Sequence, residues 1–72
     1  MKLKYYSETD TLYIDLLDRP SVDSREISEG VVLDYDESGI LVGIDIDNAS
    51  KKVDLRELTV IKVPFTVETI TA

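Results

Sequence analysis

Apolar and polar side chains alternate along most of this chain, and this alternation is the feature that most limits its fold. A period of two places apolar side chains on one face of a strand, whereas a helix needs a period near 3.6. These segments are also rich in β-branched and aromatic residues, which favours half-buried antiparallel strands. The alternating apolar residues are Leu3 and Tyr5; Leu12, Ile14 and Leu16; Val31, Leu33 and Tyr35; and Ile40, Val42, Ile44 and Ile46.

Short polar segments separate these strands and predict how they connect. Ser7–Asp10 joins the first two, and Asp36–Gly39, with Asp first and Gly fourth, has type I turn composition. If those four residues form the loop, Tyr35 lies opposite Ile40 and the apolar residues of both strands share one face. We prefer this register to a glycine-bulge register that pairs Asp36 with Ile40.

A short helix is predicted where the alternation breaks after Asp47. Asn48 can cap a helical turn, and Asp54 with Glu57 three residues later resembles a capping box. Ser24–Ser28 adds a further short strand. We therefore expect one domain over residues 1–72 with an α+β fold. It contains a mostly antiparallel sheet of about five to six short strands in hairpins, and one short helix before the C-terminal strand.

The alternation returns in Thr59–Ile70, which we expect to form the final strand. Pro64 has no backbone donor, so this strand lies at a sheet edge or contains a bulge. A chain of this length buries only about 60% of its surface. Small domains without disulfides or metals often gain stability by association. We expect a homodimer, with a final strand packed on the helix as the alternative; the expected interface residues are Ile61, Val63, Phe65 and Val67.

The composition excludes several function classes. There is no cysteine and no histidine, so thiolate nucleophiles, cysteine-based metal sites and Ser-His-Asp or Cys-His mechanisms are excluded within one chain. Any bound metal has to be a hard ion such as magnesium or calcium. We expect no enzyme activity and no cofactor.

The charge balance points away from nucleic acid. Fifteen acidic residues against eight basic ones leave a net charge of −7, which repels phosphate backbones. A basic protein is the partner that this charge would suit. The N-terminal segment has no apolar signal region, and no apolar run approaches the ~20 residues of a membrane span. We expect a cytoplasmic protein without membrane contact.

One acidic motif has the spacing of a calcium loop. It reads Asp34-x-Asp36-x-Ser38-Gly39, with Asp45 in the closing position. The flanks alternate with period two, whereas such a loop needs helices on both sides, so a hairpin turn is favoured. We expect no metal site and keep Asp34, Asp36 and Asp45 as the alternative ligands. A magnesium-dependent hydrolase using Asp34 and Asp45 is the corresponding alternative function.

Three ordered blocks resemble a known family. Tyr5–Leu16, Glu26–Glu37 and Gly39–Ile46 with Ala49-Ser50 are similar to the conserved blocks of domain of unknown function 2283, found in small prokaryotic proteins, over about residues 2–52. The resemblance implies no established activity. It also implies neighbouring toxin-like genes, which suits an acidic, antitoxin-like neutraliser of a basic partner as an alternative function. The prediction that we carry forward is a small, acidic, non-enzymatic sheet module that self-associates.

Overall fold

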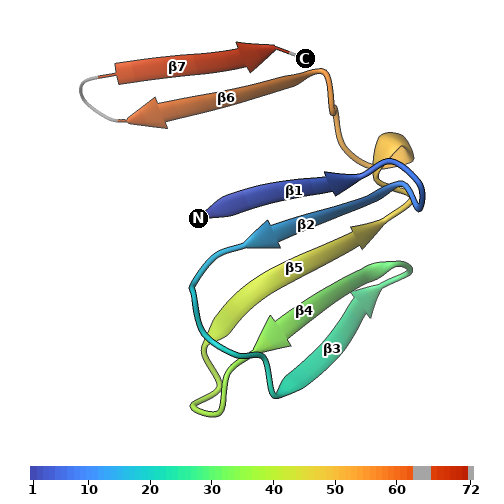
Figure 1. The fold of residues 1–72 in the computed structure, drawn as a ribbon, viewed down its shortest axis with the longest axis vertical. Helices are drawn as coiled ribbons and strands as arrows, with labels where there is room; N and C mark the ends of the chain where they lie inside the picture. Colours follow the sequence, from blue (N-terminus) through green and yellow to red (C-terminus); the bar gives the residue numbers. More distant parts are fainter. Residues whose placement is uncertain (63–65, 72) are drawn as a thin grey trace.

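The computed structural model describes residues 1–62 and 66–71, and antiparallel strands dominate them (Figure 1). Five strands form one sheet in the order β1-β2-β5-β4-β3, and β6 pairs only with β7. The expectation of a mostly antiparallel sheet is confirmed. The strands are β1 (Lys2–Tyr6), β2 (Thr11–Asp15), β3 (Asp23–Ser28), β4 (Val31–Tyr35), β5 (Leu41–Asp47), β6 (Glu57–Lys62) and β7 (Thr66–Thr71).

Strand pairing separates the two faces of the five-stranded sheet as the alternation predicted. Directly opposed residues in antiparallel strands point to the same side, and on one side of β1, β2, β5 and β4 apolar residues oppose apolar residues, whereas Val32 lies opposite Asp45 on the other side. We call one side the apolar face: Leu3, Tyr5, Leu12, Ile14, Val31, Leu33, Ile44 and Ile46. We call the other side the polar face: Lys4, Tyr13, Asp15, Asp34, Gly43, Asp45 and Asp47.

The preferred register of the β4–β5 hairpin is wrong. At the turn, the Asp36 N–H donates to the Ile40 carbonyl at 2.9 Å, and Gly39 has a φ of 81°. This is the glycine-bulge arrangement, which alone would bring polar residues of β4 beside apolar residues of β5. A second one-residue shift between Asp34 and Tyr35 cancels the first, so that Leu33 lies opposite Ile44. The second shift returns the apolar side chains of β4 and β5 to the same face, which the turn alone would have separated, and burial of that face favours this arrangement.

The predicted helix is only one short turn, so the α+β expectation is wrong and the described chain is essentially all-β. It holds a single 3₁₀ helix, η1 (Ala49–Lys51). Asn48 precedes η1 in the left-handed region, at φ 52°, and its side chain makes no capping bond. The Asp54 carboxylate accepts the N–H of Arg56, two residues on, which forms a local turn in place of the predicted capping box.

The final segment is also not the single strand that we expected. β6 and β7 form an antiparallel hairpin in which Ile61 lies opposite Val67. A strand running through Pro64 would lack one donor, which favours two shorter strands. Of the predicted interface residues, Val63 and Phe65 lie outside the described residues. Ile61 is 64% exposed.

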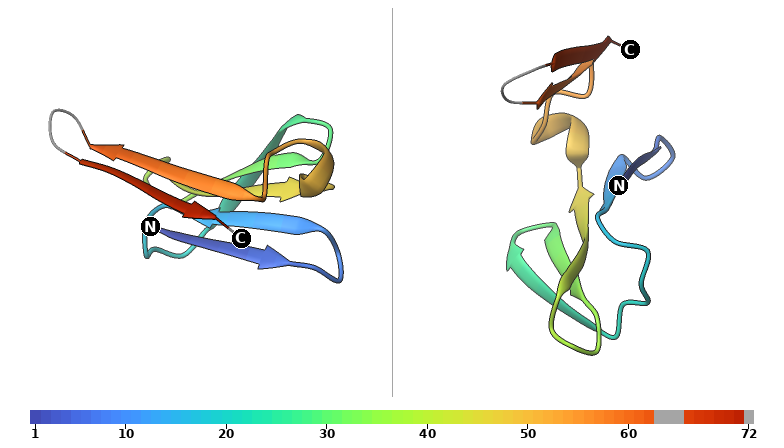
Figure 2. Two further views of the ribbon diagram at one scale, coloured as in Figure 1. Left: turned by 90° about the horizontal axis from the view of Figure 1, so that it is seen from above. Right: turned by 90° about the vertical axis from the view of Figure 1, so that its left-hand side faces the viewer.

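The molecule is a single layer, with little interior. Its extents are 34 × 31 × 18 Å, and the β6–β7 hairpin extends beyond the β1 edge and does not cover the sheet (Figures 1 and 2). The radius of gyration is 13.6 Å, compared with about 11 Å for a compact domain of this length. Within the described residues, the buried apolar side chains are Leu12, Val42 and Ala49. The chain alone therefore has a thinner core than a compact monomer.

Candidate functional site

The apolar face has only partial cover from its own chain. The segment after η1 contributes Val53 and Leu55, and β6 contributes Leu58, to a groove of about 330 Å³. The sheet side of this groove is formed by Leu3 and Tyr5 of β1 and by Leu12 of β2. Both β1 side chains remain exposed. The cover therefore reaches one side of the face, over β1 and β2.

Over β5 and β4 the burial is uneven, because Val42 of β5 is buried whereas the apolar side chains at the centre of the apolar face are less so. In the described ranges, substantial contacts between strands occur only between hydrogen-bonded neighbours. Val31, Leu33, Ile44 and Ile46 are accordingly only half-buried, although they lie in the middle of the sheet. Contiguous apolar surface of this kind is typical of interaction sites.

Asp10 fixes η1 to the turn between β1 and β2. Its carboxylate accepts the Tyr5 hydroxyl at 2.8 Å, the Ser50 hydroxyl at 2.7 Å and the Ser50 N–H at 3.1 Å. Its carbonyl accepts the Ala49 N–H at 2.9 Å. The Ser50 bonds and then the Tyr5 bond lower the pKa of Asp10. These bonds determine where the chain leaves the sheet.

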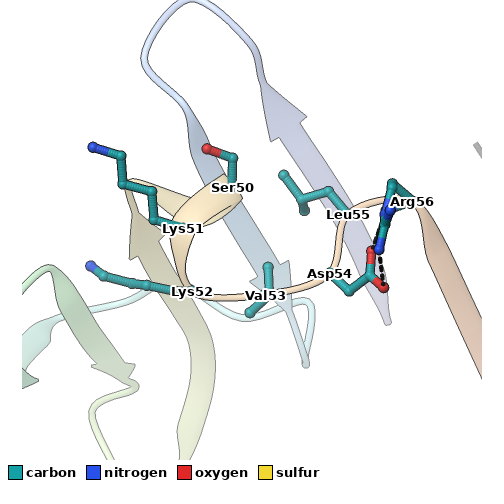
Figure 3. A pocket seen from close by; sticks show the side chains of 7 residues that line it. All are labelled: Ser50, Lys51, Lys52, Val53, Asp54, Leu55 and Arg56. Atoms are coloured by element: carbon teal, nitrogen blue, oxygen red, sulfur yellow. Dashed lines mark hydrogen bonds and ion pairs between the residues drawn. The ribbon is translucent and has the colours of Figure 1, made fainter.

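Lys52 holds the segment that follows. Its ammonium group donates to the carbonyls of Glu29, at 2.9 Å, and Asp47, at 2.6 Å. Figure 3 shows a second hollow, lined by residues 50–56, with Lys51 and Lys52 on one side and Arg56 at the other end, paired with Asp54 at 3.1 Å. The basic residues therefore do not converge on a common point, as binding of an anion would require.

A tyrosine crosses the polar face. The Tyr13 hydroxyl of β2 reaches over β5 and donates to Asp34 of β4 at 3.0 Å, and Ser24 of β3 donates to the same carboxylate at 2.7 Å. Gly43 makes this crossing possible, because a Cβ there would overlap the Tyr13 hydroxyl. Burial, with a smaller contribution from Asp34, raises the pKa of Tyr13 to about 12.

Asp45 is the least satisfied carboxylate on the polar face. Its Oδ1 is buried and has no hydrogen-bond partner among the described residues. Burial raises the pKa of Asp45, and the neighbouring carboxylates of Asp47 and Asp34 raise it further. This arrangement disfavours the ionised form of Asp45, and it therefore costs stability near neutral pH.

Asp36 has a structural role in its turn. One carboxylate oxygen accepts the N–H groups of Ser38 at 2.8 Å and Ile40 at 2.9 Å, and the other pairs with Arg19 at 3.2 Å. The Ile40 bond, with Arg19 and Ser38 adding to it, lowers the pKa of Asp36. The carboxylates of Asp34 and Asp36 are thus engaged by protein donors in different networks. In the part of the chain that the structure describes, no three acidic side chains are placed to hold a metal ion.

Sequence reasoning missed the two polar connections that cross between elements. Asp10 and Ser50 are 40 residues apart, and Tyr13 and Asp34 are 21 apart. The second connection requires Tyr13, Gly43 and Asp34 to share one face. The correct register of β4 and β5 would have placed these three residues side by side. The wrong register therefore concealed the Tyr13–Asp34 bond.

Comparison with known proteins identifies the family of this chain. Among the described residues, no helix has the length and apolar character needed to cross a membrane. No curated protein and no solved structure matches the chain. The family model described as "Protein of unknown function (DUF2283)" matches residues 2–50. This range includes the five-stranded sheet and ends at Ser50, the residue bonded to Asp10. The chain therefore belongs to the DUF2283 family.

Proposed function

We propose that this protein is a small, acidic, non-enzymatic interaction module that forms a homodimer through the apolar face. The observation that supports this proposal is the half-buried centre of that face, over β4 and β5, on which no second layer packs in the described residues. A sheet with one apolar face needs a cover to form a stable core. A second copy of the same chain supplies such a cover without any other component.

The amount of exposed surface suits a dimer. The chain has an accessible surface of 5606 Å², whereas a compact monomer of 8.1 kDa has about 4,500 Å². The difference, about 1,100 Å², is similar to the roughly 800 Å² that each partner buries in a standard interface. Association of this size would bring the exposed surface down to that of an ordinary folded domain.

The distribution of charge also favours contact through the apolar face. Asp34, Asp45 and Asp47 lie on the polar face, so they stay in water when two apolar faces meet. Contact through the polar faces would instead bring the carboxylates of the two copies together, which disfavours association. The net charge of −7 then serves solubility.

Sedimentation velocity of the full chain tests this proposal. The wild type should sediment as a dimer at micromolar concentration, and Leu33→Glu should sediment as a monomer because it places a charge at the centre of the contact. Leu17→Glu is the matched control, since Leu17 follows β2 and is already 41% exposed. Circular dichroism checks that each variant keeps its strands. A folded, monomeric wild type would rule out the proposal.

The polar face favours a second candidate function. An acidic surface opposite the dimer contact would remain free to neutralise a basic protein, as in an antitoxin-like role. Capture of host proteins on immobilised protein, washed at rising salt, tests this idea. A partner released between low and moderate salt supports it, and an Asp45→Lys/Asp47→Lys double variant should lose that partner. No partner, or one insensitive to salt, would count against it.

A further inference from the structure

We infer that the β6–β7 hairpin of each copy binds the apolar face of the other copy, over β4 and β5, so that the two chains exchange hairpins across the dimer. This inference rests on the proposed self-association and adds how the two copies meet. Two observations in the same chain support it. The hairpin does not pair with the five-stranded sheet, and the apolar face over β4 and β5 is only half-buried.

The hairpin forms no backbone pairing with the five-stranded sheet in the described residues. Within the described residues, β6 and β7 pair only with each other, and the hairpin lies beyond the β1 edge (Figure 1). An isolated two-stranded hairpin is at best marginally stable in water. A hairpin of six-residue strands therefore needs an apolar surface to pack against.

Both sides of β6 carry apolar side chains. Leu58 and Val60 are on one side, and Leu58 lines the groove with the chain's own β1 and β2. Ile61 is on the opposite side and is 64% exposed, and the register places Val67 across from it. Among the described side chains, the hairpin therefore places Leu58 against its own sheet and leaves Ile61, on the opposite side, exposed.

The short segment between η1 and β6 prevents the hairpin from covering the centre of its own apolar face. Ser50 is bonded to Asp10 and Lys52 to the carbonyl of Asp47, so the chain leaves the sheet from a fixed point. Only residues 53–56 remain before β6, a reach of at most about 14 Å. They lead past β2 to the β1 edge, away from β4 and β5 (Figure 2).

A two-fold symmetric dimer gives the hairpin an apolar surface to pack against and gives the apolar face a cover. When two apolar faces meet about an axis that runs parallel to the strands and lies over β2, the region beyond the β1 edge of one copy lies over β5 and β4 of the other. The Ile61 side of each hairpin then faces Leu33 and Ile44 of its partner. The contact is self-complementary and closed, as expected of a symmetric dimer.

Cross-linking between introduced cysteines tests the exchange, since the natural chain has none. A full-length Ile61→Cys chain and a ¹⁵N-labelled full-length Leu33→Cys chain are mixed and treated with a short bis-maleimide. Mass spectrometry then separates mixed from same-variant products. The mixed product should exceed that of an Ile61→Cys and Leu17→Cys control by about tenfold, because docked thiols meet at millimolar effective concentration. Val31→Cys serves as a second sheet position if Leu33→Cys folds poorly.

The outcomes separate this inference from the proposed function. A dimer whose mixed product stays at the control level overturns the exchange and leaves self-association standing. A monomer by sedimentation overturns both. A double variant, Leu33→Cys with Ile61→Cys, adds a further check. Cross-linking of its two thiols within one chain would show that the hairpin covers its own sheet, which also overturns the exchange.

Discussion

The five-stranded sheet and the β6–β7 hairpin contain the same kind of strand, but they are held in different ways. In the sheet, side chains connect separate strands and loops, whereas the hairpin bonds that the structure describes join Thr59 to Glu57 and Thr69. The family match also covers only the sheet and η1. The side-chain bonds that connect strands, turns and η1 include Tyr5–Asp10, Asp10–Ser50, Tyr13–Asp34 and Ser24–Asp34.

This difference indicates which contacts fix the position of each region. The arrangement of the sheet is fixed by contacts within one chain, which include side-chain hydrogen bonds between residues far apart in the sequence. The hairpin has backbone pairing and apolar side chains but few contacts that fix its position. Its stability should therefore depend on what it packs against more strongly than that of the sheet does.

Amide hydrogen exchange gives the largest expected difference between the two regions. Amides of β5, which is paired on both sides, should exchange about a hundredfold more slowly than those of β6 in dilute protein, or about 2.8 kcal/mol in opening free energy. Raising the protein concentration should slow exchange in β6 far more than in β5. Equal protection of β6 and β5 in a monomeric sample would contradict the distinction.

Substitution of Gly43 should damage the sheet without acting on the hairpin. A Cβ at this position overlaps the Tyr13 hydroxyl and breaks its bond to Asp34, so Gly43→Ala should cost about 2–3 kcal/mol. Thermal unfolding at fixed concentration measures this cost. Gly39→Ala is the control: a Cβ there meets nothing within 4 Å, and only its positive φ opposes alanine, at about 1 kcal/mol. Equal losses would exclude the proposed role of Tyr13.

Asp45→Asn should produce a smaller, stabilising change. Because the pKa of Asp45 is raised in the folded state, the native chain keeps this proton longer than the unfolded chain. Stability is therefore lost as pH rises from about 3.8 through the native pKa, and the substitution removes that loss. We expect a gain of about 0.5–1 kcal/mol, or roughly 4 °C, at pH 7 and almost none at pH 3. Asp18→Asn, which removes the same charge from an exposed loop, should not reproduce this dependence.

The alternation of side chains predicted most of the sheet correctly. Four strands and the faces that they present follow from a period of two, because a buried face tolerates only one parity. Leu33 and Ile44 do share a face, although they were not expected to oppose each other. The face on which each side chain lies could be predicted from the sequence. The register of β4 and β5 could not, because the register depends on a turn and a bulge whose one-residue shifts cancel.

Other features could not be derived locally. Asp54 and Glu57 have the spacing of a capping box, but the Asp54 carboxylate bonds the backbone of Arg56 instead, and no helix follows. The Asp10–Ser50 contact joins residues from opposite ends of the family match, and no local pattern signals such a pair. The placement of the polar residues of the site thus required the complete topology.

The two cancelling shifts in the β4–β5 hairpin have a consequence for how this loop can evolve. Removing one residue near Gly39, with the bulge retained, would turn every later side chain of β5 over, exposing Ile44 and burying Asp45. Natural variants of this loop should therefore differ by even numbers of residues, or carry a second insertion or deletion that cancels the first.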